Sequence, residues 1–237
     1  MRPWRLEWTP EQVRAFWDWY AEHPSLQSEY CSRFVGHSML DEIARHIPMS
    51  GTVVDLGAGP GFVTEQLLAR GIKTYAFDSS RKSVEALQER FGAHPNLLGA
   101  AVAEDGIPLA DGVADAVLLV ETIEHVDEIG GQSLLREVRR VLRPGGYVAM
   151  TTPHREDLSR SEIVCPNCQC VFHRMQHLRS FGPAELSATA EKAHFRRILC
   201  RATYFSSYQG LHRTLERVRR KLEGSADPHL LFIGQRG

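Results

Sequence analysis

An apolar segment that runs into three alternating glycines constrains this chain more than any other feature. Val53 and Val54 lead into an acid, Asp55, and a helical pattern of apolar residues begins at Phe62. This order predicts a buried strand, a tight turn and the N-terminus of a helix. Glycine backbones reach positive φ angles and let a ligand approach without an intervening Cβ atom. We therefore expect a ligand-binding loop with glycines at Gly57, Gly59 and Gly61.

The spacing of the glycines separates this loop from two other glycine-rich motifs. A dinucleotide fingerprint, G-x-G-x-x-G, would place its third glycine where Phe62 stands. A P-loop is excluded because no Lys followed by Ser or Thr comes next. The pattern resembles motif I of class I S-adenosylmethionine-dependent methyltransferases. That resemblance implies a cofactor site formed by the glycine loop and Phe62, in which Asp55 helps to hold the cationic methionine end.

A second acid supports the same interpretation. Residues 72–77 predict a strand that ends at Asp78, 23 residues after Asp55. A carboxylate there can accept both ribose hydroxyls, because it has two acceptor oxygens; the alternative is that Asp78 caps the helix predicted at 81–90. Ser79 is expected to line the same site. The resemblance also implies a polar contact to the adenine amino group, for which Glu104 and Asp105 are both candidates.

Strand and helix patterns alternate along the rest of the chain. Strands are predicted at 97–102, 115–120, 147–152, 197–204 and 230–235, and Leu142-Arg-Pro-Gly-Gly146 is a further match to the methyltransferase family. The resemblance implies an α/β fold: a seven-stranded, mostly parallel sheet with helices on both faces and an antiparallel last strand. We predict an N-terminal helical cap at 1–48, with helices from Thr9 and over 28–46. A methyltransferase domain at 49–237 would carry an insertion at 154–181.

The composition limits the cellular compartment and the binding partners that we expect for this chain. The 237 residues are 43% apolar and carry a formal charge of −1, which argues against nucleic acid as a partner. The chain has no apolar run of 18 residues and no secretory leader pattern, so no membrane partner is expected. Its five cysteines do not form a disulfide framework, and a cytoplasmic protein is predicted. No motif specifies an oligomeric state.

Glu121-x-x-Glu124-His125 follows a predicted buried strand and should face the ligand crevice. It resembles the same stretch of ubiquinone-pathway O-methyltransferases and of small-RNA 3′-terminal 2′-O-methyltransferases; in the RNA enzymes these residues bind a divalent ion. Glu121 is assigned to the cofactor side of the site. We predict His125 as the general base for an acceptor hydroxyl, with His154 as the second candidate. The alternatives are a metal that lowers the hydroxyl pKa and a simple helix cap.

A cluster of cysteines and histidines lies in the predicted insertion. Cys165, Cys168, His173 and His177 offer two thiolates and two imidazoles, which is a complete tetrahedral set for a structural zinc ion. Cys170 is an alternative ligand. A competing site would place a catalytic ion between Glu121, Glu124, His125 and one of the two later histidines. A cysteine-rich loop without metal is the third alternative.

These features predict transfer of a methyl group from S-adenosylmethionine, most simply to oxygen on a small-molecule or sugar-like acceptor. Two other classes stay open: a metal-assisted RNA 2′-O-methyltransferase and a non-catalytic zinc-containing cofactor-binding module. A late basic helix at 211–222 is expected to bury Leu211, Leu215, Val218 and Leu222 and to leave its cations in solvent.

Overall fold

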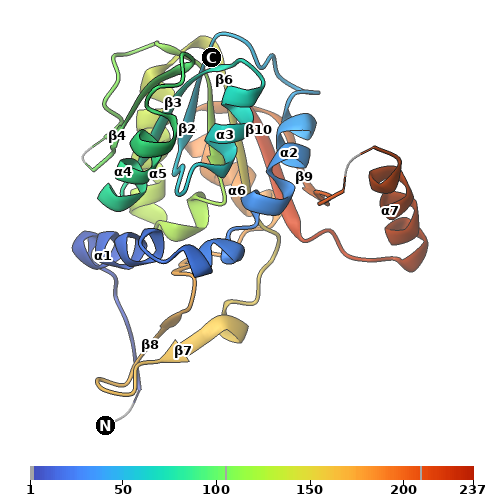
Figure 1. Cartoon of the computed structure of the whole chain (residues 1–237). Helices are drawn as coiled ribbons and strands as arrows, with labels where there is room; N and C mark the ends of the chain where they lie inside the picture. Colours follow the sequence, from blue (N-terminus) through green and yellow to red (C-terminus); the bar gives the residue numbers. More distant parts are fainter. Residues whose placement is uncertain (1–2, 105, 209) are drawn as a thin grey trace.

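A seven-stranded sheet forms the centre of the molecule. The computed structural model describes residues 3–237 apart from 105 and 209. The strand order is β4-β3-β2-β5-β6-β10-β9, and β10 alone runs antiparallel to its neighbours (Figure 1). The predicted fold class is therefore confirmed. The strands are β2 (Thr52–Leu56), β3 (Lys73–Asp78), β4 (Leu97–Val102), β5 (Ala114–Val120), β6 (Leu142–Pro153), β9 (Phe195–Thr203) and β10 (His229–Arg236).

Helices cover both faces because the central strands are apolar on both sides. Along β5, Leu118 packs in one core and Leu119 in the other, as the two-residue period of a strand requires. The core around Leu119 includes side chains of α5 (Glu128–Val141) and α6 (Pro183–Lys192), and the core around Leu118 includes those of α2 (Ser32–Ile43) and α3 (Phe62–Ala69). The fourth helix, α4 (Arg81–Phe91), follows β3 and packs on the sheet through Leu87.

The N-terminal segment forms helices that lie across the carboxyl ends of the strands (Figure 1). Helix α1 (Pro10–Ala21) starts with the predicted capping box, in which the Thr9 hydroxyl accepts from the backbone N–H of Gln12. The single helix predicted for 28–46 is wrong. A 3₁₀ turn, η1 (Pro24–Glu29), comes first, and α2 starts only at Ser32 because Tyr30 has an extended backbone.

The insertion after β6 contains a small hairpin that projects from the body beside the N-terminus (Figure 1). A short 3₁₀ turn, η3 (Leu158–Ser161), leads into β7 (Glu162–Val164), which pairs antiparallel with β8 (Cys170–His173). The N-terminal strand β1 (Trp4–Arg5) pairs with the other edge of β8. Two segments about 165 residues apart in the chain are thus joined in one three-stranded sheet.

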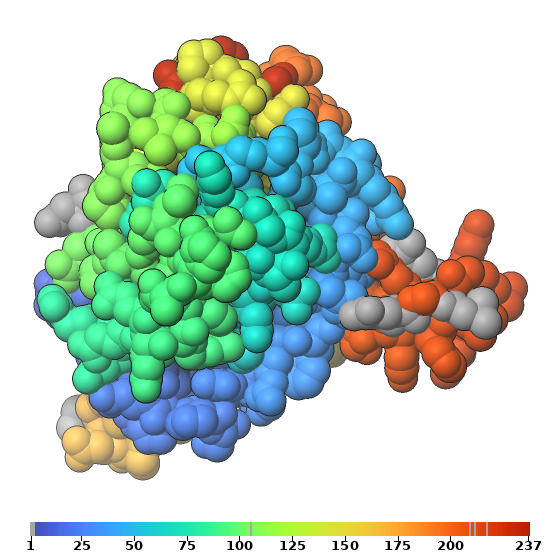
Figure 2. All heavy atoms as spheres, turned by 45° about the horizontal axis from the view of Figure 1, so that its top comes forward, coloured from blue at the N-terminus to red at the C-terminus, as the bar shows by residue number. Residues whose placement is uncertain are grey.

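The late helix α7 (Gly210–Glu223) stands out from the side of the body (Figures 1 and 2). The prediction that Leu215, Val218 and Leu222 are buried is wrong, and the predicted burial of Leu211 concerns a side chain outside the described part of the chain. Leu215, Val218 and Leu222 are 56%, 53% and 83% exposed. The polar face contacts the body instead, because Arg213 pairs with Asp41 at 2.7 Å and Tyr204 donates to Glu216 at 2.5 Å. None of the helices in the described part of the chain is long and apolar enough to cross a membrane.

Gly61 shows why the loop after β2 requires glycine. Its φ is +86°, and an added Cβ would lie 2.5 Å from Leu87 Cδ2. Gly71 has a similar φ of +74°, yet nothing lies within 4 Å of its added Cβ. A comparison of alanine substitutions at these two glycines therefore separates the backbone cost of a positive φ from the cost of a steric clash.

We expect Gly61→Ala to lower the free energy of unfolding more than Gly71→Ala does. Both variants bear the left-handed backbone cost of about 1–2 kcal/mol, and overpacking against Leu87 adds about 1–3 kcal/mol at position 61 alone. Urea unfolding of the ligand-free protein measures both. Equal losses in the two variants would show that Leu87 and its neighbours move aside without cost.

Candidate functional site

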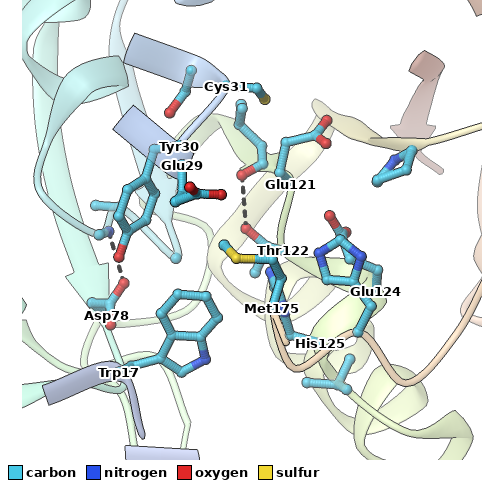
Figure 3. Close-up of a pocket in the computed structure, with 18 of the residues that line it drawn as sticks. Trp17, Glu29, Tyr30, Cys31, Asp78, Glu121, Thr122, Glu124, His125 and Met175 are labelled. Atoms are coloured by element: carbon cyan, nitrogen blue, oxygen red, sulfur yellow. Dashed lines mark hydrogen bonds between the residues drawn. The ribbon is translucent and has the colours of Figure 1, made fainter. Parts of the chain in front are cut away.

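A cavity of about 400 Å³ lies at the carboxyl ends of the central strands. This volume is within the range of ligand pockets in enzymes, about 300–1,000 Å³. Residues from the glycine loop, the N-terminal cap, the end of β5 and the insertion line it together. Figure 3 shows Asp78 on one side and Glu124 and His125 on the other, with Trp17 at the edge between them. The fold therefore brings both predicted halves of the site into one space.

Asp78 fixes the shape of the glycine loop. Its Oδ2 accepts from the backbone N–H of Gly59 at 2.8 Å, and its Oδ1 accepts from the N–H of Ser80 at 2.8 Å. Ser80, not Asp78, is the N-cap of α4, so the capping alternative for Asp78 is wrong. Each carboxylate oxygen has a second lone pair for a ligand hydroxyl. Burial raises the pKa of Asp78, although these two N–H groups oppose that shift.

Asp55 lies at the bottom of the cavity and is buried. Its Oδ2 accepts from the Thr64 hydroxyl at 2.6 Å. Burial raises the pKa of Asp55 to about 7, so its charge is costly without a cationic partner. A ligand ammonium beside it would favour the ionised form. Gly57 has a φ of +78°, and an added Cβ would lie 2.6 Å from the Thr122 side chain, so this position requires glycine.

The other predicted cofactor residues divide into two groups. Ser79 and Glu121 line the cavity with the residues just described, whereas Gly61, Phe62 and Glu104 do not. Gly61 instead sets the start of α3, and Phe62 lies against Tyr30 with ring centroids 6.2 Å apart. Glu104 pairs with Arg14 at 3.0 Å. The alternative residue, Asp105, lies outside the described residues.

Glu121 occupies a strained position where β5 ends. Its φ is +51°, which is uncommon for a residue with a side chain. The backbone N–H of Glu121 donates to Thr151 O at 3.0 Å, and Glu121 Oε1 lies 3.8 Å from His229 Nδ1. Such strain is concentrated at functional sites in proteins. It turns the chain so that Glu124 and His125 follow in the short turn η2 (Ile123–His125).

Opposite the glycine loop is a group that we call the histidine–carboxylate cluster: Glu124, His125, Glu156, His173 and His177. Glu156 connects its two later histidines. Glu156 Oε2 lies 2.5 Å from His177 Nδ1, and Glu156 Oε1 lies 3.3 Å from His173 Nε2. The His177 ring is 4.9 Å from His125 and 4.5 Å from His173, measured between centroids.

Burial controls the charges in this cluster. It lowers the pKa of His125 to about 3, and the neighbouring His177 acts in the same direction, so His125 is a neutral imidazole near pH 7. Burial also raises the pKa of Glu124 well above its usual range, and the nearby Glu121 adds to that shift. Neither carboxylate oxygen of Glu124 makes a regular hydrogen bond with a described residue, although the nearby Thr152 hydroxyl opposes the rise in pKa. A buried carboxylate without partners is costly unless a proton or a cation accompanies it.

Gln176 joins the N-terminal cap to this cluster. It is fully buried, its Oε1 accepts from Trp17 Nε1 at 3.0 Å, and its Nε2 donates to the backbone oxygen of His125 at 2.9 Å. The Trp17 ring contacts the His125 ring edge-on, with centroids 4.9 Å apart. Gln176 and Glu156 were not predicted as site residues from the sequence. Trp17 belongs to an aromatic stripe on α1, formed with Phe16 and Tyr20, for which contact with substrate and plain packing against the sheet were equal alternatives.

The predicted zinc ligands are not gathered into one group. Among the described residues, the Cys165 and Cys168 sulfurs cluster with Cys170, whereas His173 and His177 cluster with Glu156. The competing set is partly assembled, because Glu124, His125 and His177 offer ligand atoms within 4.8 Å of one another. His154, the second candidate base, is not among the cavity-lining residues, and its Nδ1 lies 3.1 Å from Asp227 O.

Comparison with known proteins gives consistent matches. Residues 54–150 match the family model described as a methyltransferase domain. An uncharacterised methyltransferase of Mycobacterium tuberculosis is 36% identical over 105 residues, covering 44% of this chain and 41% of that protein. The ubiquinone biosynthesis O-methyltransferase of Ralstonia nicotianae is 30% identical over 162 residues, covering 65% of this chain and 62% of that enzyme. The chain thus aligns with less than two thirds of either relative.

A solved structure extends the similarity in fold over the whole chain. The 1,6-didemethyltoxoflavin-N1-methyltransferase of Burkholderia thailandensis, solved with bound 1,6-didemethyltoxoflavin and S-adenosylhomocysteine, superposes with a TM-score of 0.64. It covers 99% of this chain and 93% of its own at 15% identity. At that identity the match supports the fold alone. The matched family region includes Asp55, Asp78 and the Glu124–His125 pair.

We expect Asp78→Ala to weaken binding of S-adenosylmethionine and S-adenosylhomocysteine by roughly 1–3 kcal/mol, because a buried charged acceptor is removed. Isothermal titration calorimetry measures this change. Asp111→Ala is the matched control, since the Asp111 side chain is 79% exposed and pairs only with Arg140 at the surface. Unchanged affinity in a folded Asp78→Ala protein would contradict the assignment of this cavity to the cofactor.

Proposed function

Because this chain contains a class I S-adenosylmethionine-dependent methyltransferase domain, we propose that it methylates an oxygen atom of a small-molecule or sugar-like acceptor. The observation that carries the proposal is the position of the histidine–carboxylate cluster in the same cavity as the glycine loop. A sulfonium methyl donor needs little activation, whereas an acceptor hydroxyl must lose its proton near the transition state. Imidazoles beside the cofactor supply that function.

Residues that line this cavity can accept the proton that the proposed methyl transfer releases. The acceptor oxygen attacks the methyl carbon, an O–CH₃ bond forms, the S–CH₃ bond breaks, and S-adenosylhomocysteine is released. The hydroxyl proton passes to an imidazole nitrogen. His125 is the base predicted from the sequence; burial lowers its pKa to about 3, which keeps the ring neutral but makes it a weak proton acceptor. His177 joins it as a candidate, because Glu156 holds His177 Nδ1 at 2.5 Å and would stabilise the protonated ring.

The size and the closure of the cavity favour a small acceptor. The cap residues Trp17 and Tyr30 and the insertion residue Met175 line the space together with the cluster. Enclosure by such side chains positions two reactants and removes water, which contributes more to methyl transfer than covalent chemistry does. The formal charge of −1 and the small volume weigh against a long RNA substrate.

Turnover should fall about 10²-fold or more in His125→Gln and His177→Gln, with cofactor affinity little changed, because general-base catalysis contributes about that factor. His154→Gln is the matched control, since His154 lies outside the cavity lining. The assay follows S-adenosylhomocysteine release from a panel of phenols, catechols and sugar-like alcohols, each paired with its methyl ether. Transfer to amines but to no hydroxyl compound would contradict the proposal.

One observation favours a metal-assisted form of the same reaction. Glu124 is fully buried, neither of its carboxylate oxygens makes a regular hydrogen bond with a described residue, and its carboxylate lies with His125 and His177. Carboxylate and imidazole suit Mg²⁺ or Mn²⁺. Glu124, His125 and His177 would hold the ion, with Glu156 orienting His177 from behind. A divalent ion bound there would lower the pKa of an acceptor hydroxyl.

A bound divalent ion should be detectable without any substrate. Mn²⁺ is expected to raise the melting temperature of the ligand-free protein, because an ion that binds only the folded state stabilises it. The shift should disappear in Glu124→Gln and persist in Glu104→Gln, whose carboxylate lies outside the cavity lining. If Mn²⁺ gives equal shifts in both variants, or none in the native chain, the metal-assisted form is wrong and the imidazoles act alone.

Two predictions from the sequence, the cytoplasmic location and the bound zinc ion, stay as proposals. The cysteines among the described residues are all free thiols, which fits the predicted cytoplasmic location. The non-catalytic alternative loses support, because both cofactor acids line a cavity shared with buried titratable groups. The predicted zinc ion has no part in the chemistry proposed above.

A further inference from the structure

Three cysteines come together at the turn of the β7–β8 hairpin. The sulfur atoms of Cys165, Cys168 and Cys170 all lie within 4.8 Å of one another, and those of Cys168 and Cys170 are 3.3 Å apart. In tetrahedral zinc–thiolate sites the Zn–S length of about 2.3 Å implies sulfur separations of about 3.8 Å. The spacing of these three thiols is therefore close to what one zinc ion requires.

The backbone of the turn is already arranged for metal binding. Cys165 N–H donates to Cys170 O, and Gln169 N–H donates to Cys165 O, both at 2.9 Å. Gln169 takes a left-handed φ of +61°, which closes the turn. The backbone N–H groups of Cys168 and Asn167 face the Cys165 sulfur. Zinc binds thiolates, not thiols.

A bound cation would reduce the electrostatic repulsion among the three cysteine thiolates. Three thiolates so close together would repel one another. A bound dication neutralises that repulsion.

Burial alone gives the hairpin little stability. It projects from the body (Figure 1), and Ile163 and Val164 are 45% and 54% exposed. The N-terminal strand is fastened here as well, since Trp4 Nε1 donates to Cys168 O at 3.1 Å. Metal binding offsets the chain entropy of segments that cannot form a core of their own.

The hairpin is connected to the catalytic cavity by a series of packed rings. Phe172 contacts Trp8, which contacts Phe16, with centroid distances of 5.7 and 5.4 Å. Phe16 contacts Trp17 at 5.2 Å, and Trp17 contacts His125 at 4.9 Å. Order at the hairpin therefore supports the wall of the cavity on the side of His125.

We propose that Cys165, Cys168 and Cys170 bind one zinc ion, with the fourth coordination position left to solvent beside the exposed Cys168. The site is separate from the histidine–carboxylate cluster and does not depend on the proposed methyl transfer. It replaces the two-cysteine, two-histidine set expected from the sequence. Its role is to order the hairpin and strand β1, which hold the cap over the cavity.

Elemental analysis of the full chain, purified without oxidation from zinc-supplemented medium, tests the proposal. About one zinc per chain is expected. Zinc should fall to near zero in Cys168→Ser and Cys170→Ser. It should stay at the native level in Cys200→Ser, a half-buried thiol of β9, and in His173→Ala and His177→Ala. Cobalt substituted into the native chain should show sulfur-to-metal charge-transfer absorption, a readout that needs no variant to fold.

Three results would overturn the proposal. They are a native chain without zinc and without the cobalt–thiolate absorption, zinc retained in both cysteine variants, and zinc lost from His173→Ala as completely as from Cys168→Ser. Loss of zinc from His173→Ala would favour the ligand set of two cysteines and two histidines predicted from the sequence. Hydrogen exchange adds a positional check: removal of zinc with a chelator should speed exchange in β7, β8 and β1 and leave β5 protected.

Discussion

The hydrogen bonds that Asp78 accepts from the glycine loop are the contacts on which the rest of the site depends. They join the end of β3 to the turn after β2, so that the loop, the carboxylate and the start of α4 form one rigid edge. Everything else in the cavity is placed against this edge. The cap reaches it directly, because Asp18 of α1 accepts from the Ser80 hydroxyl at 2.6 Å.

The two sides of the cavity have different electrostatic characters. Asp55 and Asp78 are buried acids that a cationic, hydroxyl-bearing ligand would satisfy. Across the cavity, burial keeps His125 neutral and raises the pKa of Glu124 well above its usual range. A donor that carries positive charge and an acceptor that must lose a proton thus meet environments suited to each. This division is consistent with methyl transfer to oxygen.

Local sequence patterns predicted the features that depend on neighbouring residues. The strand–glycine–helix order gave the loop, and Thr9 with Gln12 gave the start of α1, because turns and caps need particular residues within a few positions. Features that depend on contacts between distant segments were not predicted. Gln176 bridges Trp17 and His125, and α7 turns its polar face inward through Asp41 and Tyr204. No residue spacing within the chain encodes such pairings.

A crystal structure of the protein with S-adenosylhomocysteine tests the central claim, that cofactor and base share one cavity, most directly. The account predicts the ribose hydroxyls on Asp78, the amino group near Asp55, and the sulfur atom directed toward His125 and His177. Refinement with the sulfur on the far side of Tyr30 from these imidazoles, or with the ligand outside this cavity, would contradict it.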